Sequence, residues 1–219
     1  MASIEINGHE DTKGLCVDIS ERIINEVADY HFSQSGDLKE FLLTDQFLVN
    51  TYKARNTNLG YALHEINRQV SGGQHSNELL NTELFYSIAE SIVADQAIIY
   101  EQYSRLQFKK TETRQSLFRQ LLEAREYMDA HLSDDIHLDQ IIRNAFMSKY
   151  HFIRLFKATF ILSPYQYILR KRLESARVQL LGGSNVTETA FDAGYPDSSS
   201  FSKAFKAAFG VTPSSVKLK

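Results

Sequence analysis

Apolar residues recur at helical spacing along most of this 219-residue chain, and the clearest pattern lies near the C-terminus. Between residues 186 and 217 a short amphipathic segment, capped by Asn185, ends at Gly194, and a second segment begins after Asp197. Apolar residues of the second segment follow i, i+3, i+4 spacing, at Phe201, Ala204, Phe205, Ala208 and Phe209. The pattern predicts two helices joined by a tight turn.

The same pattern occurs again 49 residues earlier in the chain. Residues 152–164 align without a gap on residues 201–213, and of the thirteen pairs six are identical and three are conservative. Ser148 precedes the earlier copy as Asp197 precedes the later one. Two copies are too few for a solenoid, so the repeat favours two helix-turn-helix units. For one copy alone, an ordinary αα-hairpin with a basic outer face is an alternative.

Between the two copies the pattern predicts one long helix. Ser163 and Pro164 have the chemistry of a helix start, and Gly182 and Gly183 end the helix after Leu181. At about 1.5 Å for each residue, this helix is a rod of about 27 Å. A helix before the first copy is expected to be capped by Thr113.

The first half of the chain has a weaker pattern. Residues 15–19 alternate enough for one short strand, and helices are expected from Ser20, with its apolar side running to Tyr30, and from Asn58. Apolar residues at helical spacing then occur between Ser76 and Phe108, at Leu80, Leu84, Ile88, Ile92, Ile99, Tyr103 and Leu106. The expected fold class is therefore mainly α, with at most a short strand in the N-terminal module.

The long apolar stripe of residues 76–108 needs a surface to pack against. An N-terminal half of this size has little else to cover the stripe, so the pattern predicts a homodimer through residues 76–108. The alternative is that the stripe packs on the helices expected at 20–31 and 58–70 of the same chain.

Charge separates the chain into two parts. Residues 1–112 carry 9 Lys and Arg against 17 Asp and Glu, whereas residues 113–219 carry 15 against 10. A basic part joined to an acidic part is typical of a nucleic-acid binder with a separate regulatory module, although chance unevenness is the alternative. We expect an acidic regulatory or dimerisation module at 1–112 and a DNA-binding domain at 113–219.

Many residues of the C-terminal repeat match the signature of one known family. These are Ala176-Arg177, Leu180-Leu181, Ala190, Gly194-Tyr195, Asp197, Ser200-Phe201-Ser202, Phe205-Lys206, Gly210 and Thr212-Pro213. On this signature, residues 114–218 resemble the DNA-binding region of the AraC/XylS family of bacterial transcription regulators. The sequence departs from the family pattern at Ile142, Phe146, Ile161 and Thr189.

The resemblance implies a seven-helix domain in which a linker helix joins two helix-turn-helix subdomains. The usual N-terminal partner in this family is an effector-binding β-barrel. No proline precedes Pro164 and strand alternation is nearly absent, so a complete barrel is not expected here. The N-terminal module is then a helical module, with the tail of a truncated sensor domain as a further hypothesis.

The resemblance also implies which side chains meet DNA. Base-reading roles fall on Tyr150, Ile153, Arg154, Ser198, Ser199, Ser202 and Lys203. Arg154 has the chemistry to bond O6 and N7 of guanine, with a phosphate contact as the alternative, whereas serines reach less far and depend more on water and DNA shape. Phosphate contacts are expected from Lys149, Lys157, Arg170, Lys171, Arg172 and Lys206.

These patterns predict a sequence-specific regulator of transcription, an activator, that inserts two recognition helices into successive major grooves. The expected partners are a double-stranded DNA operator, RNA polymerase and a second copy of the chain, and a small-molecule effector is left open. The alternative is a protein-interaction or signalling module that reuses the double helix-turn-helix without reading DNA.

The sequence contains no group of residues typical of a catalytic or metal-binding site. The seven His are scattered, and Cys16 is the single cysteine, so no catalytic residue, metal site or cofactor is expected. An enzyme with a DNA-binding appendage would depend on Cys16, which lies in an apolar run typical of a buried thiol. Without a signal-peptide pattern or a long apolar run, the sequence favours a cytoplasmic protein with no membrane segment.

Overall fold

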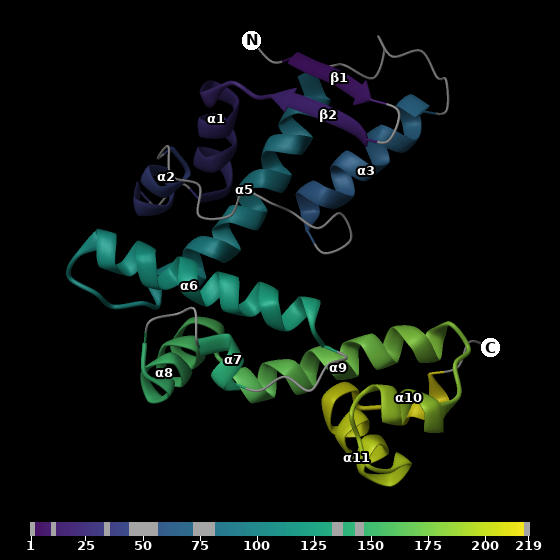
Figure 1. Ribbon diagram of the computed structural model, residues 1–219. Helices are drawn as coiled ribbons and strands as arrows, with labels where there is room; N and C mark the ends of the chain where they lie inside the picture. Colours follow the sequence, from purple (N-terminus) through teal and green to yellow (C-terminus); the bar gives the residue numbers. More distant parts are fainter. Residues whose placement is uncertain are drawn as a thin grey trace. The chain divides into compact units, whose positions relative to one another are not determined.

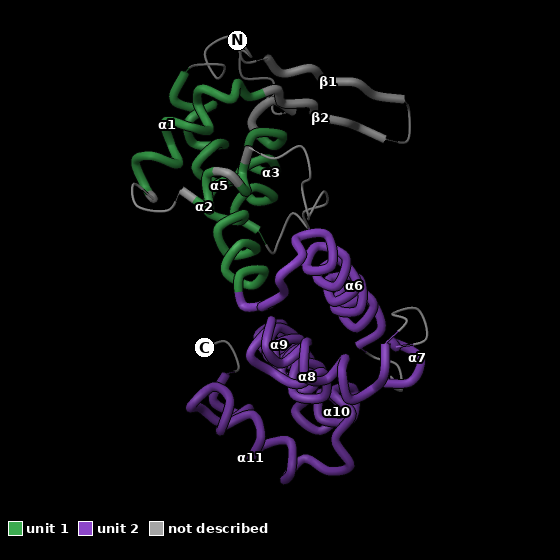
Figure 2. The backbone as a smooth tube through the Cα atoms, turned by 90° about the vertical axis from the view of Figure 1, so that its left-hand side faces the viewer, with its two compact units in different colours: residues 1–104 green, residues 105–219 purple. Residues whose placement is uncertain are grey.

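The computed structural model describes residues 3–9, 12–32, 36–43, 57–71, 82–132, 138–142 and 147–216. The chain divides into two compact units, residues 1–104 and residues 105–219 (Figure 2). The division falls after Ser104, whereas charge and pattern placed it after residue 112. None of the described helices combines the length and the hydrophobicity needed to cross a bilayer.

The first unit begins with a β-hairpin (Figure 1). Strands β1 (Ser3–His9) and β2 (Thr12–Asp18) pair antiparallel, with Ser3 opposite Asp18. The mainly α fold class is confirmed, but the expectation of at most one short strand is corrected, because an isolated strand would leave its backbone groups unpaired and β1 supplies the partner. The side chain of Cys16, expected to be a buried thiol, lies outside the described residues.

A long helix is the centre of the first unit. In its described part the helices are α1 (Glu21–Phe32), α2 (Gly36–Leu43), α3 (Asn58–Ser71) and α5 (Thr82–Ser104). One buried cluster joins α1 and α2 to α5 and contains Ile23, Val27, Ala28, Leu38, Leu42, Phe85, Ala89 and Val93. Helix α3 also packs against α5. Tyr30, expected on the buried side of the first helix, is 82% exposed.

The apolar stripe of α5 is used inside the first unit. Ile88 is 1% exposed, and Tyr103, 6% exposed, packs its ring 5.7 Å from that of Phe41 in α2. Leu80 lies outside the described residues. The stripe is therefore covered by helices of the same chain, which was the alternative reading, and it does not offer the open surface on which the homodimer through 76–108 was predicted.

The first turn of α3 is capped from a distant part of the chain. Asp95 of α5, 7% exposed, accepts hydrogen bonds from the backbone N–H of Asn58 at 3.0 Å and of Leu59 at 2.9 Å. The Thr57 hydroxyl accepts from the Gly60 N–H at 2.9 Å. These bonds satisfy the first three amides of the helix. Asn58, predicted as the cap, is instead the first helical residue, and its side-chain amide donates to Asp95 at 2.9 Å.

The second unit is helical throughout its described part. It contains α6 (Thr111–Ala130), α7 (Leu138–Ile142), α8 (Lys149–Phe160), α9 (Pro164–Leu181), α10 (Val186–Asp192), α11 (Ser198–Phe209) and the 3-10 helix η1 (Pro213–Ser215). The bounds of α9 are those predicted, and Ser163 with Gln166 forms a capping box. The Thr113 cap is wrong, because α6 begins at Thr111 after Lys110.

The second helices of the two helix-turn-helix copies coincide residue for residue. Helices α8 and α11 have 12 residues each, and their first and last residues are separated by the 49-residue repeat. Their C-caps, Ile161 at φ 69° and Gly210 at φ 74°, both adopt the left-handed conformation. Glycine has no Cβ to clash there, whereas isoleucine is β-branched and is strained. The first copy therefore carries backbone strain that the second avoids.

Asp95→Ala should destabilise the first unit by about 2 to 4 kcal/mol, because two amides of α3 and the Asn58 side chain lose their acceptor. Hydrogen exchange at the Asn58 and Leu59 amides should accelerate by tenfold or more. Asp29→Ala is the control, since the exposed pair of Asp29 with Lys39 contributes less than about 1 kcal/mol. Unchanged exchange in Asp95→Ala would contradict the cap from α5.

Ile161→Gly should stabilise the second unit by about 0.5 kcal/mol or more. Relief of about 1 to 2 kcal/mol of left-handed strain exceeds the entropy of about 0.4 to 1 kcal/mol that glycine adds to the unfolded chain. Little burial is lost, because Ile161 is 63% exposed. Urea denaturation followed by far-UV circular dichroism measures the change, and Gly210→Ile should shift the midpoint the other way. A lower midpoint for Ile161→Gly would refute the strain.

Candidate nucleic-acid interface

Each of the two recognition helices, α8 and α11, is buried along one side. In α8 the residues Phe152 and Phe156 are 0% exposed, and their ring centroids lie 5.6 Å apart. In α11 the equivalent Phe201 and Phe205 are also 0% exposed, with centroids 5.5 Å apart. Because these rings pack toward the core, the opposite side of each helix faces solvent.

The outer side of α8 carries the residues predicted for the first reader, Lys149, Tyr150, Ile153, Arg154 and Lys157. Tyr150 is 78% exposed, and Arg154 and Lys157 are also exposed, whereas Ile153 is half-buried. The Lys149 ammonium forms an ion pair with Asp139 of α7 at 2.9 Å. Tyr150, Arg154 and Lys157 are therefore exposed on α8, and Lys149 is exposed but paired with Asp139.

The outer side of α11 carries the residues predicted for the second reader, Ser198, Ser199, Ser202, Lys203 and Lys206. Ser199, Lys203 and Lys206 are exposed, and the other two serines are half-buried. The Ser202 hydroxyl donates to the Ser198 carbonyl at 2.6 Å, and the Ser198 hydroxyl donates to the Thr187 hydroxyl of α10 at 3.4 Å. Both hydroxyl hydrogens are engaged within the protein, so these serines offer a ligand mainly their acceptor lone pairs.

The start of α11 is ordered by Asp197. Its carboxylate accepts hydrogen bonds from the backbone N–H groups of Ser199 at 2.9 Å and Ser200 at 2.8 Å. Hydrogen bonds from Ser200, the backbone N–H first, hold the pKa of Asp197 below its usual range. Asp197 therefore stays ionised as a helix cap, as its position in the sequence predicted.

The two outer faces match position for position across the 49-residue repeat. The equivalent pairs are Tyr150 and Ser199, Ile153 and Ser202, Arg154 and Lys203, and Lys157 and Lys206. The basic residue nearest the C-terminus is thus the same in both copies, whereas the residues of the first two turns differ in size and hydrogen-bonding character. The helices α8 and α11, which have the same length, therefore expose different side chains on their outer faces.

The basic run at the middle of α9 is engaged in contacts within the unit. The Arg170 guanidinium pairs with Glu174 at 3.0 Å and donates to the Ala208 carbonyl at 3.3 Å. The Lys171 ammonium lies 3.4 Å from the same Glu174 carboxylate. The bond to Ala208 holds α9 against the end of α11, and the pairs with Glu174 reduce the charge that this run presents to a phosphate.

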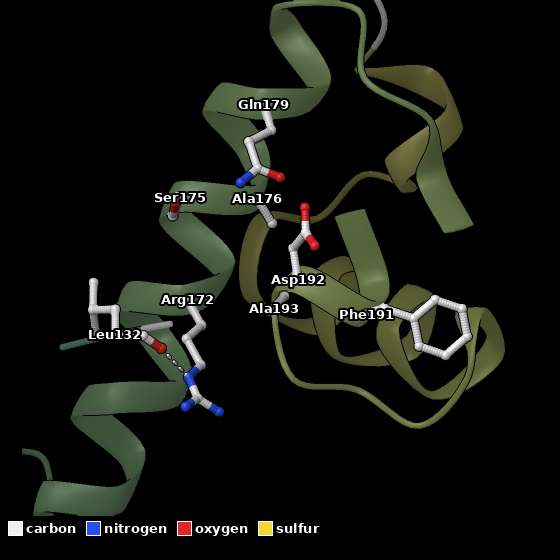
Figure 3. Close-up of a pocket in the computed structure, with 8 residues that line it drawn as sticks. All are labelled: Leu132, Arg172, Ser175, Ala176, Gln179, Phe191, Asp192 and Ala193. Carbon is white, nitrogen blue, oxygen red and sulfur yellow. Dashed lines mark hydrogen bonds between the residues drawn. The ribbon is translucent and has the colours of Figure 1, made fainter. Parts of the chain in front are cut away.

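Arg172 points into a pocket of about 370 Å³ between α9 and α10 (Figure 3). The pocket is lined by Leu132, Arg172, Ser175, Ala176, Gln179, Phe191, Asp192 and Ala193. The Arg172 Nε donates to the Leu132 carbonyl at 2.8 Å. Residues two apart on a helix point in nearly opposite directions, so Arg170 and Arg172 do not form the single basic surface that their proximity in the sequence suggested.

The buried side of the interface also explains one departure from the family pattern. Thr189 of α10 is 0% exposed. The family that this sequence resembles usually has an aliphatic residue at this position. Its hydroxyl donates to the Asn185 carbonyl at 2.7 Å, so the buried polar group is satisfied within its own helix. Phe146 lies outside the described residues.

Over the described ranges of the chain, no group of three or more His, Cys, Asp or Glu side chains could hold a metal ion. What the outer faces of α8 and α11 do offer is hydrogen-bond donors, acceptors and positive charge on two convex helices. This arrangement has the shape and the chemistry to bind in a groove.

Comparison with known proteins also identifies a helix-turn-helix domain in the second unit. The family described as helix-turn-helix domain matches residues 141–218. The probable transcriptional regulator LumQ of Photobacterium leiognathi is 35% identical over 89 residues, which cover 40% of this chain and 36% of LumQ. The regulatory protein SoxS of Salmonella typhimurium is 29% identical over 90 residues, which cover 41% of this chain and 84% of SoxS.

A solved transcriptional regulator of Chromobacterium violaceum, described as AraC-type, is 26% identical and has a TM-score of 0.42, covering 44% of this chain and 88% of its own. The matched segment is about a third of the length of LumQ, so the likeness covers only part of that protein. The C-terminal part of this chain, residues 141–218, belongs to the helix-turn-helix domains of AraC-type transcription regulators.

Proposed function

We propose that this protein is a sequence-specific, double-stranded DNA-binding regulator of transcription. The observation that carries the proposal is the pair of 12-residue helices α8 and α11, which share one frame and turn basic and polar outer faces to solvent. The names of the relatives, LumQ as a probable transcriptional regulator and SoxS as a regulatory protein, support the same function.

The linker helix supports binding at two adjacent sites on one duplex. Helix α9 has 18 residues, which at about 1.5 Å each make a rod of about 27 Å. Successive major grooves on one face of B-DNA are about 34 Å apart. A rod of this length is of the right order to let α8 and α11 enter successive major grooves, so that one chain reads two half-sites.

The two helices are proposed to read DNA unequally. Arg154 of α8 has a planar guanidinium that can bond O6 and N7 of one guanine, whereas Lys203 at the same position of α11 is a point charge. Tyr150 and Ile153 add apolar contact area for a thymine methyl, whereas Ser199 and Ser202 are short. The α8 helix is therefore the stronger base reader, and α11 depends more on phosphates, water and DNA shape.

Phosphate contacts are proposed first for Lys157 and Lys206, which are exposed near the last turn of each recognition helix. Lys149 has Asp139 as a partner and Arg170 and Lys171 share Glu174, so these three contribute less. Arg172 is assigned a different role below.

The proposal includes regulatory partners of the whole protein. An activator would bring RNA polymerase to a promoter next to the bound operator, and the first unit would carry regulation by an effector or by a second copy of the chain. Because the stripe of α5 is buried within the first unit, a homodimer would form through another surface. The acidic first unit carries no residues assigned to DNA.

Selection of bound duplexes from a random DNA pool tests the proposal. The expected product is a duplex with two half-sites about one helical turn apart, bound with an affinity that falls steeply as salt rises. Binding that shows neither a selected sequence nor a salt dependence would favour the protein-interaction module instead.

Arg154→Ala should weaken binding to the selected duplex by about 1 to 3 kcal/mol and relax the preference at one base pair, because the bidentate contact to guanine is lost. Affinities for duplexes substituted at each position measure both effects. Lys157→Ala on the same helix is the matched control and should weaken all duplexes alike. An equal loss on every duplex for Arg154→Ala would indicate a phosphate contact.

Lys206→Ala should lower the affinity evenly across sequences and flatten the slope of log K against log salt by about one unit, as expected for one phosphate contact. Titrations at several salt concentrations give the slope. Lys109→Ala, which removes an exposed lysine from the segment before α6, should leave the slope as it is. A slope unchanged by Lys206→Ala would place Lys206 away from DNA.

A further inference from the structure

The first half of the linker helix is attached to the first helix-turn-helix subdomain. The Tyr167 hydroxyl of α9 donates to the Asp129 carboxylate of α6 at 2.9 Å. The Tyr167 ring packs edge-on against Phe156 of α8, with centroids 5.7 Å apart. Burial, and then the Asp129 charge, raise the pKa of Tyr167, so the phenol keeps the hydrogen that it donates.

The middle and the second half of the same helix are attached to the second subdomain. Leu173, Ala176 and Leu180 of α9 belong to one buried cluster with Phe201 and Phe205 of α11. The guanidinium groups of Arg170 and Arg177 lie 5.1 Å and 5.2 Å from the ring centroid of Phe209, from which each gains a cation–π attraction. The rod is thus packed at both ends.

Arg172 touches both subdomains with one side chain. Its Nε donates to the carbonyl of Leu132, which follows α6 in the first subdomain (Figure 3). Its Nη1 lies against Gly194 in the turn between α10 and α11, so closely that a Cβ at residue 194 would be 2.5 Å away. Gly194 has φ of 79°, a left-handed conformation that glycine adopts without strain, and a side chain at this residue would displace the Arg172 guanidinium from its present position.

The planar guanidinium of Arg172 is hydrogen-bonded to Leu132 on one edge and packs against Gly194 on the other. It therefore fixes the relative position of these two segments more firmly than a flexible side chain would. If Leu132 and the Gly194 turn are held by the same rigid group, α11 cannot rotate about the α9 axis without breaking a hydrogen bond or opening a gap. We propose that Arg172 is a positioning residue that sets the orientation of α11 relative to α8, and so the half-site spacing that the protein accepts. The part concerning DNA rests on the proposed function above.

One test needs no DNA. Spin labels placed at Tyr150→Cys and Ser199→Cys, in a Cys16→Ser background, report the separation of the two recognition helices by pulsed electron paramagnetic resonance. Arg172→Ala should broaden the distribution of distances by about twofold, whereas Arg119→Ala, which removes the same charge from an exposed site on α6, should not. Identical distributions in the two variants overturn the proposal.

The second test uses duplexes whose selected half-sites are moved one base pair closer or further apart. One base pair turns the second half-site by about 35°, which a rigid protein cannot follow. Arg172→Ala should reduce the preference for the original spacing by about tenfold, comparable with the loss of a hydrogen bond to a charged group. Its affinity for a duplex with the first half-site alone should equal that of the parent.

The other outcomes of these tests also decide whether Arg172 has this positioning role. A full spacing preference in Arg172→Ala overturns the positioning role, and so does a loss of affinity for the single half-site, which would mean a direct DNA contact or a folding defect. Arg172→Lys, which keeps the charge without the planar fork, should show a smaller change in the same direction. If the parent protein selects no duplex, the proposed function fails, while the label distances still report on Arg172.

Discussion

The outer faces of the recognition helices depend on two pairs of phenylalanines beneath them. Phe152 and Phe156 in α8, and Phe201 and Phe205 at the same places in α11, are 0% exposed. Burial of each ring contributes about 1.5 to 3 kcal/mol, and rotation of either helix about its axis would return the rings to water. The side that faces solvent is therefore determined by the packing on the other side, before any contact with a ligand.

The same frame lets the two copies differ in chemistry without differing in shape. Both helices are closed by a left-handed residue, Ile161 in one and Gly210 in the other, even though the first of these residues is poorly suited to it. Packing and the following turn evidently outweigh a local strain of about 1 to 2 kcal/mol. Arg154 and Lys203 then occupy equivalent places on helices of the same length and present different side-chain chemistry to solvent.

Positive charge in the linker helix shows how a sequence pattern can mislead. Arg170, Lys171 and Arg172 are consecutive, and a run of this kind is typical of a surface that binds phosphate. In the folded unit they diverge around the helix, two of them pairing with Glu174 and the third bonding the Leu132 carbonyl. Much of this charge is therefore engaged in contacts within the second unit.

The sequence by itself determined several features of the second unit that depend on neighbours within a few residues. The repeat, the Asp197 cap, the turn at Gly194 and the bounds of α9 all follow from short-range spacing and are present in the structure. Only the tertiary structure decided the features that join distant segments. The cap of α3 comes from Asp95, 37 residues beyond Asn58, and Arg172 bonds a carbonyl 40 residues before it. The stripe of α5 is covered by helices of its own unit, and the β2 strand pairs with β1. Such contacts depend on how whole elements pack together, and no local pattern of apolar residues specifies which of several surfaces a helix will meet.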